Sequence, residues 1–256
     1  MSTNPILELK GVSKNFGAVR ALSNVDFRAR VGEVMALVGD NGAGKTTLIK
    51  GIAGIYPFDH GEIYFDGKKV SIHNPRDSVA LGIDVVYQDL ALVDNLDVVA
   101  NMFLGRETTS SPWLLDETSM EKACLKILES LSVTSLHSVR QAVVGLSGGQ
   151  RQAISVAKAV MWNSRLVILD EPTAALGMAQ TRHVLDLVRR LADKGLAVIL
   201  VSHNLHNIFE VADRITVLRL GQKVAEFVAA HTTQQEVVHA ITAGTLSHLA
   251  GMAIEK

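Results

Sequence analysis

The sequence has very little cysteine, because Cys124 is the one cysteine among 256 residues. A disulfide within the chain is therefore excluded, and this usage is typical of a reducing compartment. A single cysteine of this kind is far more often a small buried apolar side chain than a reactive thiol.

An excess of charge of either sign is also absent. The 25 lysines and arginines nearly balance the 26 aspartates and glutamates, which leaves a net charge of −1. A protein that binds nucleic acid through its overall field usually carries a basic excess, so we expect no nucleic-acid partner. Long hydrophobic runs are missing too, since residues 196–201 fall far short of the roughly 20 residues that span a bilayer. The start, Met1-Ser2-Thr3-Asn4-Pro5, lacks the features of a secretion signal, so we expect an unexported chain.

The order of strand-like and helix-like segments predicts an α/β fold with an interrupted core. Apolar runs predict early strands at residues 6–9, 25–29, 33–38, 62–65 and 83–87. Helical periods follow at residues 98–104, 117–131 and 148–160, with no convincing strand between them. Alternating strands and helices then return at residues 166–169, 178–192, 197–201, 205–211 and 215–218, before a strand to 228 and a helix at 232–242. We therefore predict a core at residues 1–90 and 162–256 and a helical insertion at residues 91–161.

A glycine-rich segment lies between a predicted strand and a predicted helix. Residues 39–46 fit the pattern G-x-x-x-x-G-K-[ST], in which backbone N–H groups surround phosphate oxygens. Lys45 would bind the β- and γ-phosphates, Thr46 would offer its hydroxyl to Mg²⁺, and Thr47 would add a phosphate hydrogen bond. A turn that matches by chance is disfavoured by the strand before it and the helix after it. The residues predicted to bind the nucleotide here are Gly39, Asn41, Gly42, Ala43, Gly44, Lys45, Thr46 and Thr47.

Two carboxylates end a second apolar strand. Asp170 and Glu171 follow residues 166–169 directly, at the edge of an open α/β sheet where ligands bind. Asp170 would hold Mg²⁺ and Glu171 would be the general base that polarises the attacking water. Alone, Asp-Glu after a strand is more often a solvated strand end. Together with the upstream phosphate loop, the pair favours hydrolysis of a nucleoside triphosphate.

The pentapeptide Leu146-Ser147-Gly148-Gly149-Gln150 is the most discriminating motif. Its serine and two glycines predict a second helix start that can bind an anion. The single nucleotide site predicted for the chain already uses the helix start after residue 44, so the second one must serve another ligand. An ordinary N-cap explains Ser147 alone, but not the full pentapeptide between the other two motifs. With these three motifs the chain resembles the ABC ATPase family. In that family the signature residues, here Ser147, Gly148, Gly149 and Gln150, reach the nucleotide held by the partner cassette of a head-to-tail dimer.

The resemblance implies a fold and further site residues. It implies a P-loop NTPase core of the RecA-like kind, with a mostly parallel sheet, an N-terminal antiparallel β subdomain and an inserted α-helical subdomain that carries the signature. Gln88 matches the glutamine that contacts Mg²⁺ or the attacking water, and His203 matches the histidine at the γ-phosphate. Phe16 matches the aromatic residue that stacks on adenine, although a core phenylalanine is comparably common at a strand end. Gly177 departs from the family, because many members carry an aspartate there that contacts the opposite cassette.

The finer resemblance is to importers of monosaccharides. Residues 71–83, 101–107 and 171–177 look like the ATPases of bacterial ribose, xylose and fructose importers. This implies an ATP hydrolase that uses ATP and Mg²⁺ and couples hydrolysis to sugar uptake. It further implies a second cassette, membrane permease subunits, an indirect periplasmic sugar-binding protein, and a peripheral location at the cytoplasmic face of the inner membrane.

Three alternatives stay open at this point. The chain could serve another transported solute, or it could be a non-transport ABC ATPase that acts on DNA or ribosomes. The DNA-repair members carry a long coiled-coil insertion and the translation members usually carry two cassettes, and neither feature is present. A P-loop kinase or GTPase is disfavoured, because the guanine-reading motif is missing and the signature would have no role in either.

Overall fold

The computed structural model describes residues 5–111, 113–133, 136–174 and 176–244. The expectations about residues 1–4 and about Ala175 fall outside these ranges. The strands are β1 (Leu7–Phe16), β2 (Val19–Ala29), β3 (Val34–Val38), β4 (His60–Phe65), β5 (Lys68–Val70), β6 (Ile83–Val86), β7 (Thr109–Ser111), β8 (Leu114–Leu115), β9 (Leu166–Asp170), β10 (Ala197–Val201), β11 (Arg214–Arg219) and β12 (Gln222–Val228). The helices are α1 (Lys45–Ile52), α2 (Pro75–Ala80), α3 (Val98–Phe103), α4 (Glu117–Ser130), α5 (Gly148–Val160), α6 (Met178–Asp193), α7 (Leu205–Val211) and α8 (Gln234–Ala243), with short 3-10 turns at Val143–Gly145 and Ala229–His231.

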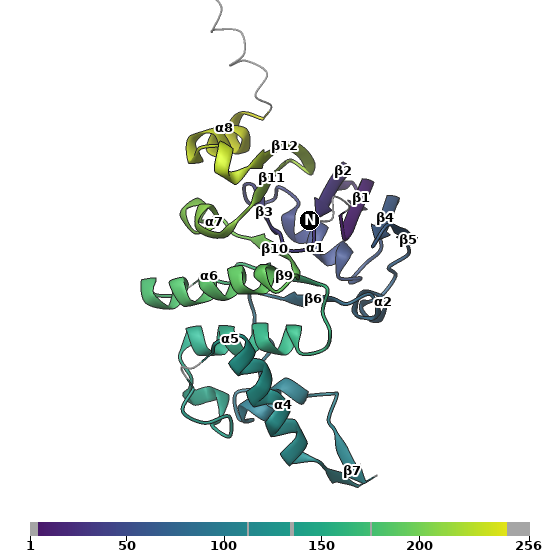
Figure 1. The fold of residues 1–256 in the computed structure, drawn as a ribbon. Coiled ribbons are helices and arrows are strands. Elements are labelled where there is room, and N and C mark those ends of the chain that lie inside the picture. Colours follow the sequence, from purple (N-terminus) through teal and green to yellow (C-terminus); the bar gives the residue numbers. More distant parts are fainter. Residues whose placement is uncertain (1–4, 112, 134–135, 175, 245–256) are drawn as a thin grey trace, which may run out of the picture.

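Two sheets form the framework of the molecule. The core sheet has six strands in the order β12-β11-β3-β10-β9-β6, and all neighbouring pairs are parallel except β11 with β12. The second sheet is antiparallel and has the order β2-β1-β4-β5. Figure 1 shows the antiparallel strands beside the core sheet, and α4 and α5 below it. The predicted fold class is confirmed.

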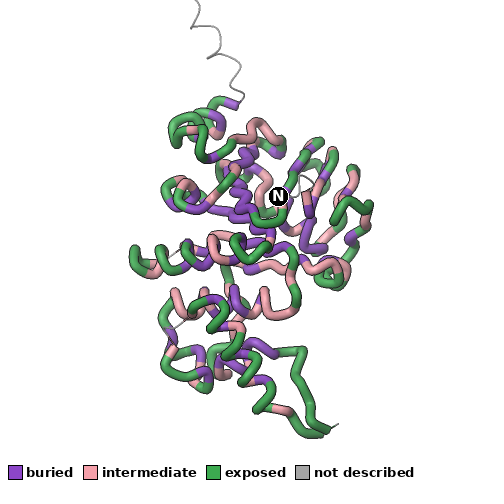
Figure 2. Tube along the Cα trace, viewed as in Figure 1, coloured by how far each residue is buried: buried purple, intermediate pink, exposed green. Residues whose placement is uncertain are grey.

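The core strands are buried on both faces, as parallel strands usually are. Alternate residues of β9 contact opposite hydrophobic clusters, so that Val167 and Leu169 pack with α3 to α6, whereas Leu166 and Ile168 pack toward α1 and the antiparallel sheet. The buried positions in Figure 2 are concentrated along these central strands. This two-sided burial explains why the core strands read as continuous apolar runs in the sequence.

The region between β6 and β9 is mainly helical, as predicted, with α3, α4 and α5 in it. The expectation that it contains no strand was wrong, because β7 and β8 pair there as a short antiparallel hairpin. Both strands are exposed and too short to show an alternating pattern. The domain boundaries at residues 90–91 and 161–162 stay a prediction.

Two further elements, β5 and α2, were not predicted. Strand β5 pairs with β4 across the turn at Asp66 and Gly67. Helix α2 begins at Pro75 and carries a capping box formed by Asn74 and Asp77. The sequence Asn-Pro-x-Asp is a recognisable helix start, so this signal was available but was not used.

Cys124 is expected to be inert toward thiol reagents in the folded protein. The residue is fully buried in α4, with its Sγ 3.3 Å from Met102 Sδ, and burial raises the pKa of the thiol to about 12. The reactive thiolate is therefore scarce at pH 8, and reagent access is blocked as well. Labelling with a chromogenic disulfide reagent should be negligible in buffer and stoichiometric in denaturant. Rapid stoichiometric labelling of the native protein would contradict the burial.

Candidate functional site

The phosphate-binding loop connects β3 to α1. Gly44 is the N-cap of α1 and has φ of 103°, a backbone conformation that side-chain-bearing residues rarely adopt. A Cβ at this position would lie 2.8 Å from Leu22 Cδ2 and 2.9 Å from the carbonyl oxygen of Ala21. A side chain at this position is therefore excluded both by the backbone conformation and by the close packing. Because the first N–H groups of a helix have no partner within it, the start of α1 can receive an anion.

Lys45 lies inside this loop. Its Nζ donates hydrogen bonds to the carbonyl oxygens of Gly39 at 2.6 Å and Asp40 at 2.9 Å. Burial lowers the pKa of Lys45, and the negative charges of Glu171, Asp40 and Asp170 oppose that effect. The ammonium group is thus placed at the loop, within reach of the charges of Asp170 at the end of β9 and Glu171 directly after it.

An open cleft of 440 Å³ unites most of the predicted site. The predicted residues that line it are Asn41, Gly42, Ala43, Gly44, Lys45, Thr46, Thr47, Gln88, Asp170, Glu171 and His203. Gly39 lines an adjoining cavity of 490 Å³ together with Asn41 and His203. The predicted site residues therefore come from four separate segments of the chain that meet at one edge of the core sheet.

The acidic side of the cleft depends on the pairing of β9 with β10. Asp170 is the register partner of Val201, and the N–H of Glu171 donates to the Val201 carbonyl at 2.9 Å. Burial, followed by the charge of Glu171, raises the pKa of Asp170, while Lys45 acts in the opposite direction. Glu171 has φ of 50°, a strained conformation of the kind that concentrates at functional sites. His203 follows β10, and its Nδ1 lies 2.9 Å from Glu171 Oε2.

Phe16 is placed beside the cleft but does not line it. It ends β1, is 47% exposed, and packs edge-on against Tyr56 with ring centroids 5.1 Å apart. Its cross-strand partner is Val19, which lines the cleft together with Arg20 and is 66% exposed. Sequence reasoning missed both of these residues. An apolar residue at a hairpin turn opposite Phe16 was the signal that could have found them.

The signature forms the start of α5. Ser147 is the N-cap, its Oγ accepts from the N–H of Gln150 at 3.3 Å, and the Gln150 side chain accepts in return from the N–H of Ser147 at 2.9 Å. Among the described residues that line the phosphate cleft, none belongs to the signature. Ser147, Gly149 and Gln150 instead line a separate cavity of 180 Å³ between α5 and α6. The single chain therefore keeps its two anion-binding helix starts apart.

The two signature glycines are also packing positions. A Cβ on Gly148 would lie 3.0 Å from Leu176 Cδ2, and a Cβ on Gly149 would lie 3.1 Å from the Cβ of Gln180. The signature thus presses against the segment that leads from Glu171 into α6. Gly177, which departs from the family pattern, is the N-cap of α6, and its N–H donates to Gln180 Oε1 at 3.2 Å.

Comparison with known proteins identifies the family. The sequence profile of the ABC transporter family matches residues 22–174. The chain is 44% identical to a xylose/arabinose import ATP-binding protein of Sulfolobus acidocaldarius, covering 94% of this chain and 95% of that protein. It is also 44% identical to a fructose import ATP-binding protein of Rhizobium meliloti, covering 88% of each. A ribose import ATP-binding protein of Caldanaerobacter subterraneus is 40% identical over 91% of this chain, which spans 47% of that relative.

Solved structures agree with this assignment. An ATP-binding cassette of an ABC transporter in its ADP conformation superposes with a TM-score of 0.80 at 28% identity, covering 93% of this chain and 95% of that one. A dimeric cassette in a post-hydrolysis state with ADP and Pi superposes with a TM-score of 0.71 at 25% identity, covering 87% of this chain and 98% of that one. The chain belongs to the ABC transporter family. It is an ATP-binding, ATP-hydrolysing cassette of that family. No helix in the described ranges is long and apolar enough to cross a membrane.

Substitution of Gly149 by alanine should impair hydrolysis more than nucleotide binding. The added Cβ would lie 3.1 Å from the Cβ of Gln180, so the start of α5 has to shift, and because displacement of groups at a site by about 1 Å can cost roughly 10²-fold in rate, turnover should fall by about tenfold or more. Steady-state ATPase assays and a fluorescent-nucleotide titration measure the two effects separately. Gly177→Ala is the matched control, because its Cβ would approach the same neighbour, Gln180, only at an ordinary contact distance of 3.9 Å from Oε1. Turnover of the Gly149→Ala variant at the wild-type rate would show that close packing at the signature is unimportant.

Proposed function

We propose that the chain is the ATPase subunit of an importer for a monosaccharide and works only as a member of a cassette pair. The observation that carries this proposal is the separation of the phosphate cleft from the signature within one chain. Two helix starts suited to anions, in two places, suit a dimer in which each nucleotide lies between the loop of one cassette and the signature of the other. The solved relative that is dimeric and bound to ADP and Pi supports the pairing of cassettes.

Within this proposal the cleft residues have distinct roles. The loop at residues 39–47 holds the phosphates, with Lys45 at the β- and γ-phosphates. Glu171 is the general base that orients and polarises the attacking water. His203, whose Nδ1 lies 2.9 Å from that carboxylate, contacts the γ-phosphate and positions Glu171. Phe16, which lies across the β1–β2 hairpin from the cleft-lining Val19, stacks on the adenine.

The residues present also fit a magnesium ion. Mg²⁺ prefers oxygen ligands and is usually held by one or two carboxylates together with substrate phosphates. The hydroxyl of Thr46, the side chain of Gln88 and the carboxylate of Asp170 line the same cleft, and the raised pKa of Asp170 marks a buried acid that a cation would stabilise in its charged form. In the described ranges, no group of three or more His, Cys, Asp or Glu side chains could hold a metal alone. Bound with ATP, the ion would neutralise charge on the β- and γ-phosphates.

The proposed substrate and partners follow from the relatives. The three relatives named above are import ATP-binding proteins for xylose and arabinose, fructose, and ribose. By analogy, this chain would bind membrane permease subunits at the cytoplasmic face of the inner membrane and pair with an identical or related cassette. A periplasmic sugar-binding protein would deliver the monosaccharide to the permease. The sugar itself would not contact this chain.

Glu171→Gln should abolish most hydrolysis while leaving ATP binding intact. Loss of the general base is expected to lower turnover by roughly 10²- to 10⁴-fold, because the amide cannot accept the proton of the attacking water. Turnover is measured by phosphate release, and affinity by nucleotide titration. Glu210→Gln serves as the control, because Glu210 lies on α7 and pairs with His206 rather than with the cleft. Turnover of the Glu171→Gln variant at the wild-type rate would remove Glu171 from the mechanism.

Purification of the tagged chain from native membranes tests the transport function. The expected result is a complex with a permease and a second cassette, whose ATPase rate rises when a sugar-loaded binding protein is added. A panel of pentoses and hexoses then identifies the transported sugar. Retrieval of ribosomes or DNA, or stimulation only by a solute that is not a sugar, would argue against the proposal.

A further inference from the structure

The segment after Gln88 and the segment before Ser147 lie side by side, although they are far apart in the sequence. The N–H of Val143 donates to the Leu96 carbonyl at 3.0 Å, and the N–H of Val144 donates to the Asp94 carbonyl at 2.9 Å. Asp97 and Ala142 complete this contact as an isolated antiparallel bridge. We refer to residues 94–97 and 142–146 as the paired segments. Their backbones are joined by hydrogen bonds, so a displacement of one is transmitted to the other.

Arg151 joins the paired segments through its side chain. It lies in the first turn of α5, directly after the signature. Its Nη1 contacts Asp94 Oδ1 at 3.0 Å, its Nε donates to the Leu146 carbonyl at 3.3 Å, and its Nη2 donates to the Val144 carbonyl at 3.0 Å. One planar guanidinium group therefore holds an acid of the first segment and two carbonyls of the second. Of these two carbonyls, that of Leu146 belongs to the residue immediately before Ser147.

The first paired segment, residues 94–97, is attached to α3 by hydrogen bonds of the Asn101 side chain. The buried amide of Asn101 accepts from the N–H of Val93 at 2.7 Å and donates to the carbonyls of Val93 and Leu96 at 2.9 and 3.2 Å. These three hydrogen bonds attach residues 93–96 to Asn101 of α3, and a buried amide with several partners restrains its neighbours. The segment should move as a unit with α3.

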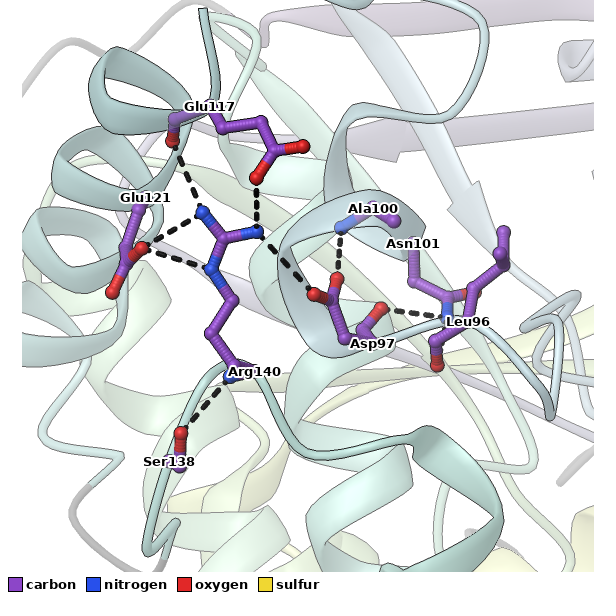
Figure 3. A network of polar contacts seen from close by, with 8 residues as sticks. All are labelled: Leu96, Asp97, Ala100, Asn101, Glu117, Glu121, Ser138 and Arg140. Atoms are coloured by element: carbon purple, nitrogen blue, oxygen red, sulfur yellow. Dashed lines mark hydrogen bonds and ion pairs between the residues drawn. The ribbon is translucent and has the colours of Figure 1, made fainter.

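Arg140 links the first paired segment, residues 94–97, to α4 through ion pairs. Figure 3 shows its guanidinium group between three carboxylates, with Asp97 at 3.5 Å, Glu117 at 3.0 Å and Glu121 at 2.8 Å. The other oxygen of Asp97 accepts from the N–H of Ala100 at 2.7 Å and caps α3. The paired segments, α3 and α4 are thereby linked, and the signature of α5 is attached to this unit through Arg151.

We propose that Asp94 and Arg151 are positioning residues that make the orientation of the signature follow the segment after Gln88. Gln88 lines the phosphate cleft, and a short stretch of chain leads from it to Asp94. Movement of that stretch displaces Asp94, and Arg151 carries the displacement to the carbonyls that precede the signature serine. The inference rests on the proposed function, because the signature acts on the nucleotide of a partner cassette.

The test compares Asp94→Ala, Arg151→Ala and the double variant with the wild-type chain. Each single change should lower ATP turnover by about fivefold to tenfold, and the double change should cost no more than the worse single change, because residues that act as a unit are not additive. ATP affinity of the single chain should stay within about twofold, because no contact of the phosphate loop is altered. Arg151→Lys should give intermediate turnover, since lysine reaches Asp94 but cannot bond both carbonyls as well.

Hydrogen exchange supplies a readout that does not depend on hydrolysis. The amides of Val143 and Val144 should exchange faster in each variant, while amides of residues 39–46 remain unchanged. The control removes an equivalent ion pair, Asp66 with Arg165 at 2.9 Å, which lies away from the signature. Removal of that pair should leave turnover and the exchange of both amides as in the wild type.

The possible results separate this inference from the proposed function. Wild-type turnover and unaltered exchange in the Asp94 and Arg151 variants would overturn the inference while leaving the ATPase assignment intact. Additive losses in the double variant would overturn it as well, because the two residues would then act independently. If the wild-type chain neither bound nor hydrolysed ATP, the proposed function would fail, and the exchange of Val143 and Val144 would still decide whether the pair holds the signature.

Discussion

The parallel pairing of β9 with β10, and of β10 with β3, is the constraint on which the rest of the structure depends. Carboxyl ends of parallel strands meet at one edge of a sheet, so whatever follows these strands is brought together. The phosphate loop follows β3, the acidic pair ends β9, and His203 follows β10. The backbone N–H of Glu171 donates to the Val201 carbonyl, so the pairing of β9 with β10 continues as far as the proposed general base.

The same sheet also separates the two anion-binding helix starts. Helix α1 belongs to the phosphate cleft, whereas α5 packs with α6 and presents the signature at a different cavity. A nucleotide bound at the cleft leaves the signature without a ligand in its own chain. In the proposed function, pairing of two cassettes would resolve this, and it would make the cohesion of the pair depend on the nucleotide. The link through Asp94 and Arg151 would give such a pair a physical route between the cleft and the signature.

Elements with long apolar runs or strong motifs were predictable from the sequence, and weaker elements were not. Strands β3, β9 and β10 are buried throughout or nearly so, which makes their runs conspicuous. The helix predicted at residues 232–242 is present as α8, and a capping box at Thr233 starts it. The hairpin of β7 and β8 was missed, because strands of two and three exposed residues carry no periodic signal.

The sequence by itself determined which local motifs the chain carries: a phosphate loop with Lys45, an acid pair at Asp170 and Glu171, and a signature at residues 146–150. These are local patterns, in which the residue type and its spacing already specify the hydrogen bonds available. Only the tertiary structure decided that Val19 and Arg20 line the cleft beside Phe16, that Glu171 lies next to His203, and that Asp94 contacts Arg151. These contacts join residues far apart in the chain, so they depend on strand order, register and helix packing rather than on any local pattern.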